Sequence, residues 1–155
     1  MTDLQELRAH ILQASSGGQS PAQYVLAFIM DFLPDPLVFV DADVPAQLAT
    51  DPGQVFVVTK SRVVLATFEN DPNNRSSVEV ETWGRSDLRR ISLEVGPDVG
   101  WHNLAGEGEA WPAGAVVTLS YKDNTPVRLP MAKHPPDFHL AKVRSITKVL
   151  LADLA

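Results

Sequence analysis

The sequence predicts an α+β domain: an antiparallel β-barrel or roll of about seven strands, capped by a C-terminal helix and preceded by two N-terminal helices. Two observations support this fold class. Residues 54–131 contain a succession of short runs in which apolar and polar side chains alternate as in strands, separated by turn-forming residues. Residues 137–154 instead place apolar side chains at helical spacing. Because short turns join several of the runs, we expect neighbouring strands to pair antiparallel.

The N-terminal part predicts two helices and one short strand. Residues 2–15 form an amphipathic helix whose apolar face consists of Leu4, Leu7, Ile11 and Leu12. Ser20 is the expected N-cap of a second helix, 21–33, which is apolar nearly all round. We therefore expect this helix to be covered by the first helix and the sheet, or by another subunit. A strand at 36–40 and a loop at 41–53 follow.

The second part contains the remaining predicted strands: 55–60, 62–68, 77–83, 88–95, 115–121 and 127–131. In strand 88–95, Ile91, Leu93 and Val95 are expected to face inward. The closing helix has an apolar stripe formed by Val143, Ile146, Leu150 and Leu154, widened by Phe138 and Val149. We expect residues 1–53 to be an extension packed on the same domain, and residues 54–155 to form the barrel with its helix.

Composition narrows the functional classes. The chain has 155 residues, enough for one buried core, and its lack of cysteine excludes disulfides, thiolate metal sites and a cysteine nucleophile. The longest apolar run, 24–30, is too short to cross a membrane. We read no secretory signal and expect a cytoplasmic protein. Residues 1–53 hold seven acidic side chains and one basic one, which accounts for the whole net charge of −6 and argues against nucleic-acid binding.

Two segments carry a resemblance to a known family. Val55 to Leu65 contains a Thr-x-x-Arg turn between apolar strands, and Trp83 to Ile91 turns into a strand that bears an isoleucine. With the order of strands and closing helix, these segments resemble a pleckstrin-homology-like (PH-like) domain in its bacterial form. The resemblance covers roughly residues 54–154. It implies a scaffold that is usually not catalytic and that binds lipid head groups, peptides or other proteins.

The resemblance also implies a place for a ligand. In lipid-binding members of the family, basic residues of three hairpin loops gather at the open end of the barrel. The matching loops here hold Lys60 and Arg62, then Arg85, then Lys122. Basic side chains at these turns would hold an anionic group by charge-assisted hydrogen bonds. Exposed turns also carry lysine and arginine for solubility alone, which is the alternative interpretation.

Other chemistry has weaker support in the sequence. His134, His139 and His102 are candidate zinc ligands, but the prolines at 135–136 disrupt helical spacing, so we expect no metal there. Three clustered carboxylates form a second candidate metal site, in a region where acidic residues more often serve only for solvation: Asp35, Asp41 and Asp43. The glycine-rich segment 106–109 carries Glu107 and Glu109, which would repel a phosphate. Three tryptophans are interpreted as core residues or edge covers in preference to a pocket lining: Trp83, Trp101 and Trp111.

These observations favour a non-catalytic binding module without a cofactor, whose partner is a protein or a small anionic ligand. Sheet edges and the apolar helix 21–33 also make self-association an expectation. The alternative is a small-molecule-binding β-barrel, for example an enzyme with a flavin-binding split barrel. Flavin absorbance of the purified protein would favour that alternative.

Overall fold

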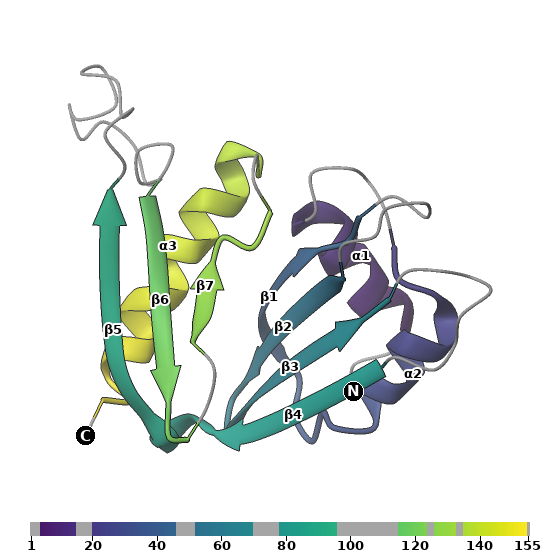
Figure 1. Ribbon diagram of the computed structural model, residues 1–155, viewed down its shortest axis with the longest axis horizontal. Helices are drawn as coiled ribbons and strands as arrows, with labels where there is room; N and C mark the ends of the chain where they lie inside the picture. The colour runs from purple at the N-terminus through teal and green to yellow at the C-terminus, as the bar shows by residue number, and fades with distance from the viewer. Residues whose placement is uncertain are drawn as a thin grey trace. The chain divides into compact units, whose positions relative to one another are not determined.

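The protein is described by a computed structural model, which covers residues 4–14, 20–45, 52–69, 78–95, 115–123, 126–132 and 135–154. The chain divides into two compact units. The first unit comprises Met1–Gly84 and Met131–His134, and the second comprises Arg85–Pro130 and Pro135–Ala155. Each unit contains one antiparallel sheet, so an α+β protein with antiparallel strands is confirmed (Figure 1).

The sheet of the first unit has the strand order β1-β2-β3-β4, in which all neighbours are antiparallel. Its strands are β1 (Leu37–Asp43), β2 (Gly53–Thr59), β3 (Arg62–Phe68) and β4 (Val78–Gly84). The strands predicted at 55–60, 62–68 and 77–83 are thus confirmed to within two residues. The strand predicted at 36–40 is longer than expected and pairs with β2, with Val40 opposite Val57. The sheet therefore begins before residue 54.

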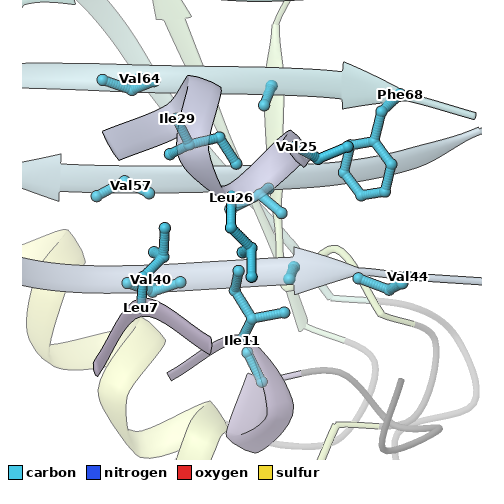
Figure 2. Close-up of a cluster of buried hydrophobic side chains, with 14 residues drawn as sticks. Leu7, Ile11, Val25, Leu26, Ile29, Val40, Val44, Val57, Val64 and Phe68 are labelled. Carbon is cyan, nitrogen blue, oxygen red and sulfur yellow. The ribbon is translucent and has the colours of Figure 1, made fainter. Parts of the chain in front are cut away.

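Two helices cover this sheet: α1 (Leu4–Ala14) and α2 (Gln23–Met30). Figure 2 shows how Leu7 and Ile11 of α1, and three residues of α2, point into one cluster with the sheet. The residues of α2 in this cluster are Val25, Leu26 and Ile29, all essentially inaccessible to solvent. Val25 and Leu26 share one side of the helix with Ile29 because they precede it by four and three residues. Burial of three large aliphatic side chains on this side explains why such a short helix is stable.

Two details of these helices correct the sequence prediction. The N-cap of α2 is Ala22, and Ser20 Oγ instead donates to the carbonyl oxygen of Pro21 at 3.2 Å, so the prediction of Ser20 as the cap is wrong. Leu12 was expected on the buried face of α1 but is 38% exposed. Ile11, the preceding residue, points into the core, and a 100° step per residue carries Leu12 toward the edge of that face.

The sheet of the second unit has the strand order β5-β6-β7. Its elements are β5 (Leu88–Val95), β6 (Ala115–Tyr121), β7 (Val127–Leu129) and the helix α3 (Asp137–Leu151). Val143, Ile146 and Leu150 of α3 are buried, which confirms the predicted stripe at these positions. Phe138 and Val149 were expected to widen this stripe, but they are 51% and 44% exposed. No helix in the described stretches combines the length and hydropathy that a membrane span requires.

Leu93 shows why alternation alone does not predict burial. It lies opposite Val117 in the β5–β6 pair, so the two side chains point to the same face of the sheet, as expected. Val117 is fully buried, whereas Leu93 is 52% exposed. The difference follows from position, because β6 is the central strand of this sheet and β5 is at its edge.

The prediction of one closed barrel is wrong. The described strands form two separately hydrogen-bonded sheets, of four and three strands. β4 and β5 follow each other in the chain, but the short 3-10 helix η1 (Arg85–Asp87) stands between them. A 3-10 turn directs its backbone groups along its own axis, so it interrupts the ladder that a barrel would need at this point. The division at residues 53 and 54 stays a prediction; α1, α2 and β1 lie in the same compact unit as β2–β4.

Candidate functional site

The turn between β2 and β3 holds the first two residues of the predicted anion site. Thr59 Oγ1 accepts a hydrogen bond from Arg62 N at 3.1 Å and donates to Arg62 O at 3.2 Å, which closes the turn. Ser61 Oγ donates to Asp35 Oδ2 at 2.5 Å. Lys60 is exposed at the tip of the turn. Ser61, the residue after Lys60, thus connects the turn to the acidic Asp35.

Arg62 itself is half-buried and lies across the sheet. Its Nε donates to Thr82 Oγ1 of β4 at 3.1 Å, and Thr82 Oγ1 donates to the carbonyl oxygen of Val63 at 3.0 Å. This chain of hydrogen bonds holds the Arg62 side chain against β3 and β4. An anion at this turn would therefore meet a guanidinium that already has a defined partner inside the sheet.

Arg85 has the most defined geometry of the predicted site residues. Its Nε donates to Asp153 Oδ2 at 2.8 Å and its Nη2 donates to Asp153 Oδ1 at 3.2 Å, a bidentate ion pair. The two side chains are only 15% and 16% exposed. Because Asp153 follows α3 and Arg85 begins η1, the pair connects the end of the last helix to the start of β5. Its charges compensate each other, so an external anion would compete with Asp153.

Tyr121, at the end of β6, lies close to this ion pair. Burial raises the pKa of its phenol well above the ordinary value, the charge of Asp153 raises it further, and Arg85 lowers it. The phenol therefore keeps its proton throughout the physiological range. A buried tyrosine that keeps its proton does not supply a base at neutral pH.

Lys122, the fourth predicted site residue, is exposed in the turn after β6. Its backbone N donates to the carbonyl oxygen of Asp87 at 2.9 Å, which brings this turn to the 3-10 helix that carries Arg85. The structure thus brings Arg85 and Lys122 to the same end of the second sheet. Lys60 and Arg62 belong to the first unit, and the gathering of all four residues at one site stays a prediction.

The candidate metal ligands have other roles where the structure describes them. Asp41 of β1 is fully buried; its Oδ1 accepts from Ala42 N at 2.9 Å and its Oδ2 accepts from Met131 N at 2.8 Å. His139 is buried in α3, whereas His102 and His134 lie outside the described residues, as do Trp101, Trp111 and the segment 106–109. Across the stretches that the structure describes, no three His, Asp or Glu side chains are grouped so that they could hold a metal ion.

The clearest exposed apolar feature is on α2. Phe28 is 49% exposed and Phe32, in the turn that follows the helix, is 40% exposed. The ring of Tyr24 contacts that of Phe28 edge to face, with centroids 6.4 Å apart and planes at 89°. Tyr24 and Phe28 are four residues apart and lie along one side of α2, and Phe32 follows at the same interval in the turn after the helix. We call Tyr24, Phe28 and Phe32 the aromatic face of α2.

Sequence reasoning found this helix but not its exposed face. It described 21–33 as apolar nearly all round, which did not distinguish the buried residues Val25, Leu26 and Ile29 from the exposed Phe28 and Phe32. The available signal was the four-residue spacing of Tyr24, Phe28 and Phe32, which sets these aromatic residues beside the aliphatic ones on the helix surface. The structure decides which of the two sides packs on the sheet.

Comparisons with known proteins give one distant similarity. No protein-family model matches the sequence. No curated protein matches it either. Among solved structures, the fold is similar to the hSac2 domain from human phosphoinositide phosphatase Sac2, with 14% sequence identity and a TM-score of 0.46. This alignment covers 84% of the present chain and 78% of that chain.

Proposed function

We propose that this chain is a non-catalytic interaction module whose partner is another protein. The observation that carries the proposal is the aromatic face of α2, where Phe28 and Phe32 are 49% and 40% exposed. Aromatic side chains contribute a large part of the binding free energy at protein interfaces, because they bury much area and lose little conformational entropy. Val25, Leu26 and Ile29 on the neighbouring side of α2 are fixed in the core of the first unit, so the aromatic face is presented on a rigid element.

The exposed apolar residues elsewhere support this surface less strongly. On α3, Phe138 is 51% exposed, but the Lys142 ammonium lies 5.7 Å from its ring centroid and gives it a cation–π partner. Leu93 is a single exposed leucine on β5. Single exposed apolar side chains are common on soluble proteins, whereas neighbouring aromatic ones indicate a contact surface.

Two further observations support a binding role on a PH-like scaffold. Within residues 54–154, to which the resemblance applies, the described strands β2–β7 are each antiparallel to their sheet neighbours and are followed by α3, the order of strands and closing helix from which the resemblance is drawn. The charged groups with the most defined geometry serve the fold: Arg85 pairs with Asp153, and Asp41 accepts from two backbone amides. These roles are structural and need no substrate.

The test compares two variants of the full chain as baits in the organism that encodes it. The double variant Phe28→Ser/Phe32→Ser removes the aromatic face, and Leu93→Ser/Phe138→Ser removes the same kind of exposed apolar area elsewhere. We expect partner proteins that the wild type and the control variant retain and that the first variant loses. The purified partner should then bind the first variant about tenfold or more weakly in calorimetry. Equal partner sets and equal affinities for the two variants would refute the proposal.

A further inference from the structure

We infer that the aromatic face of α2 binds a basic amphipathic segment of its partner, a short stretch with apolar side chains on one side and lysine or arginine beside them. This inference rests on the proposed function and adds the chemistry of the partner. It follows from where negative charge lies around the aromatic face.

Negative charge is concentrated at the C-terminal end of α2. Asp31, between Phe28 and Phe32 in the chain, is the exposed C-cap of the helix. Its backbone N–H donates to Ala27 O, which places Asp31 one helical turn after Ala27. A helix C-terminus already carries a partial negative charge, which a carboxylate at this position reinforces. The last turn of α2 contains no basic residue that would offset it. A cation supplied by a partner would be stabilised there by both charges.

The wider charge distribution has the same sign. Residues 1–53, which include both helices that cover the first sheet, hold seven acidic side chains and only one basic one. Asp35, four residues after Asp31, accepts a hydrogen bond from the neutral hydroxyl of Ser61. Asp31 and Asp35 therefore attract a basic partner to the end of α2, although Lys60, the residue before Ser61, is a basic side chain near Asp35, and the attraction will weaken as salt screens it.

This charge disfavours the other classes of occupant. A second copy of the chain would bring two strongly acidic regions together, and an acidic membrane surface or a nucleic acid would be repelled in the same way. The apolar part of the occupant is set by the aromatic face, in which the exposed Phe28 of α2 is followed four residues later by the exposed Phe32. Apolar residues three or four positions apart on a helical peptide match this spacing.

The size of the aromatic face sets the expected strength. It consists of a few side chains on a helix of eight residues, much less than the surface of a permanent complex. We therefore expect a short segment to bind with a dissociation constant on the order of micromolar or weaker. The edge-to-face contact of Tyr24 with Phe28 orders the Phe28 ring before binding, which lowers the entropic cost of ordering it on the partner.

The experiment uses the full chain and three synthetic amphipathic peptides of about 14 residues, matched in length to a short helix. All three carry leucine at the same positions, and their polar positions are lysine, glutamine or glutamate. Binding is measured by fluorescence anisotropy at low and high salt. We expect the lysine peptide to bind about tenfold more tightly than the glutamine peptide, the glutamate peptide not to bind, and the difference to shrink at high salt.

Variants locate the binding and separate its two components. Phe28→Ser/Phe32→Ser keeps every charge and should weaken the lysine peptide about tenfold, whereas Asp31→Asn keeps the apolar surface and should weaken it about threefold with a smaller dependence on salt. Leu93→Ser is the matched control and should bind as the wild type does. Circular dichroism and the urea midpoint establish that each variant is folded.

Each outcome has a defined meaning. If the glutamine peptide binds as tightly as the lysine peptide, the inference about charge is wrong, and the proposed function still stands on the capture experiment. If the lysine peptide binds Phe28→Ser/Phe32→Ser as well as it binds the wild type, the attraction is not located at the aromatic face and the inference is wrong. Failure of all three peptides to bind, or dimerisation of the wild type that Phe28→Ser/Phe32→Ser abolishes, also overturns it.

Discussion

At the scale of single residues, Asp41 is an acidic side chain that is fully buried in the first unit. Both of its carboxylate oxygens accept hydrogen bonds from backbone amides, one from its neighbour Ala42 and one from Met131. Replacement by alanine would leave both donors without this acceptor, Ala42 N in a buried place and Met131 N in a partly buried one. We expect Asp41→Ala to lower the free energy of unfolding by about 2–4 kcal/mol. Urea denaturation measures this, with the exposed Glu79→Ala as a control that should change stability by less than about 0.5 kcal/mol.

Asp41→Asn distinguishes hydrogen bonding from charge. Asparagine retains one carbonyl acceptor but points an N–H₂ group at the other donor. We therefore expect the free energy of unfolding of Asp41→Asn to lie between that of the wild type and that of Asp41→Ala. A stability equal to that of the wild type would show that the two amides do not need the carboxylate, and it would contradict the structural role given to Asp41.

Tyr121 makes stability depend on pH in alkaline solution. Its pKa is raised in the folded protein by burial, and to a smaller extent by Asp153, whereas an unfolded tyrosine ionises at about 10. Above about pH 10 the unfolded state therefore binds fewer protons than the folded state, and stability falls as the pH rises. Below that pH both states are protonated and Tyr121 adds no pH dependence.

The expected result is a loss of up to about 1.4 kcal/mol per pH unit above pH 10, caused by this single group. Tyr121→Phe cannot ionise, so its stability should vary less with pH in this range than that of the wild type. Urea denaturation at several pH values from 8 upward compares the two proteins. Parallel profiles above pH 10 would show that the Tyr121 phenol is not shielded from ionisation as its surroundings indicate.

Residue-level roles were the hardest to predict from the sequence. Arg85 was expected at the tip of a loop as part of an anion site, and the structure pairs it with Asp153, 68 positions later in the chain. Asp41 was assigned to a loop of solvated acids, yet it is fully buried. Both roles depend on partners that are distant in sequence, and local pattern carries no information about which distant residue will complete a hydrogen bond.

At the scale of elements, the pairing of β2 with β3 depends on a glycine. Gly53 lies opposite Phe68 in the register, and a β-carbon added at Gly53 would come within 2.6 Å of the Phe68 ring. Phe68 is almost fully buried, so its ring has little freedom to move away. We expect Gly53→Ala to lower the free energy of unfolding by about 1–3 kcal/mol through overpacking. Gln54→Ala, on the next and exposed position of β2, should have little effect.

A double variant tests this contact directly. Phe68→Leu alone removes buried area and should destabilise the protein, but it also makes room for a β-carbon at position 53. The cost of Gly53→Ala/Phe68→Leu should therefore be smaller than the summed costs of the two single variants. Additive costs in urea denaturation would mean that the side chains at 53 and 68 do not meet.

The ion pair at the end of α3 bears on the predicted anion site. If Arg85 and Lys122 hold an anion together with Lys60 and Arg62, Asp153 competes for Arg85, and Asp153→Asn should raise the affinity for acidic vesicles several-fold, roughly three to ten times. Replacement of the four basic residues by alanine should abolish binding to acidic vesicles. If wild type and Asp153→Asn both fail to bind acidic vesicles in a sedimentation assay, the predicted site is wrong.

Elements were predicted better than their assembly. The hairpin of β2 and β3 was located within two residues, because its apolar runs are rich in valine and flank a turn that Thr59 closes. The bounds of β5 and β6 agree with those expected. What alternation does not encode is which strands share hydrogen bonds across the chain, and for this reason the same runs were combined wrongly into one barrel.

At the scale of the whole molecule, the path of the chain connects the two units repeatedly. It leaves the first unit after Gly84, returns to it for Met131–His134, and continues into the second unit with α3. The bond from Met131 N to Asp41 Oδ2 fixes this return to β1. Neither unit is a continuous segment, so unfolding of the first unit releases the segment that leads into α3. We therefore expect both units to unfold in one cooperative transition.

Two core variants test this cooperativity, one in each unit. Val57 in β2 and Leu119 in β6 are both fully buried. Val57→Ala and Leu119→Ala should each destabilise the protein, by about 2 kcal/mol or more, and each should move the entire urea transition, with coincident curves from circular dichroism and tryptophan fluorescence. Independent units would instead give two transitions, of which Leu119→Ala shifts only one. Native-state hydrogen exchange resolves the same question strand by strand: in a cooperative molecule, either variant lowers the protection of the most stable amides in both β2 and β6 by equal amounts of free energy.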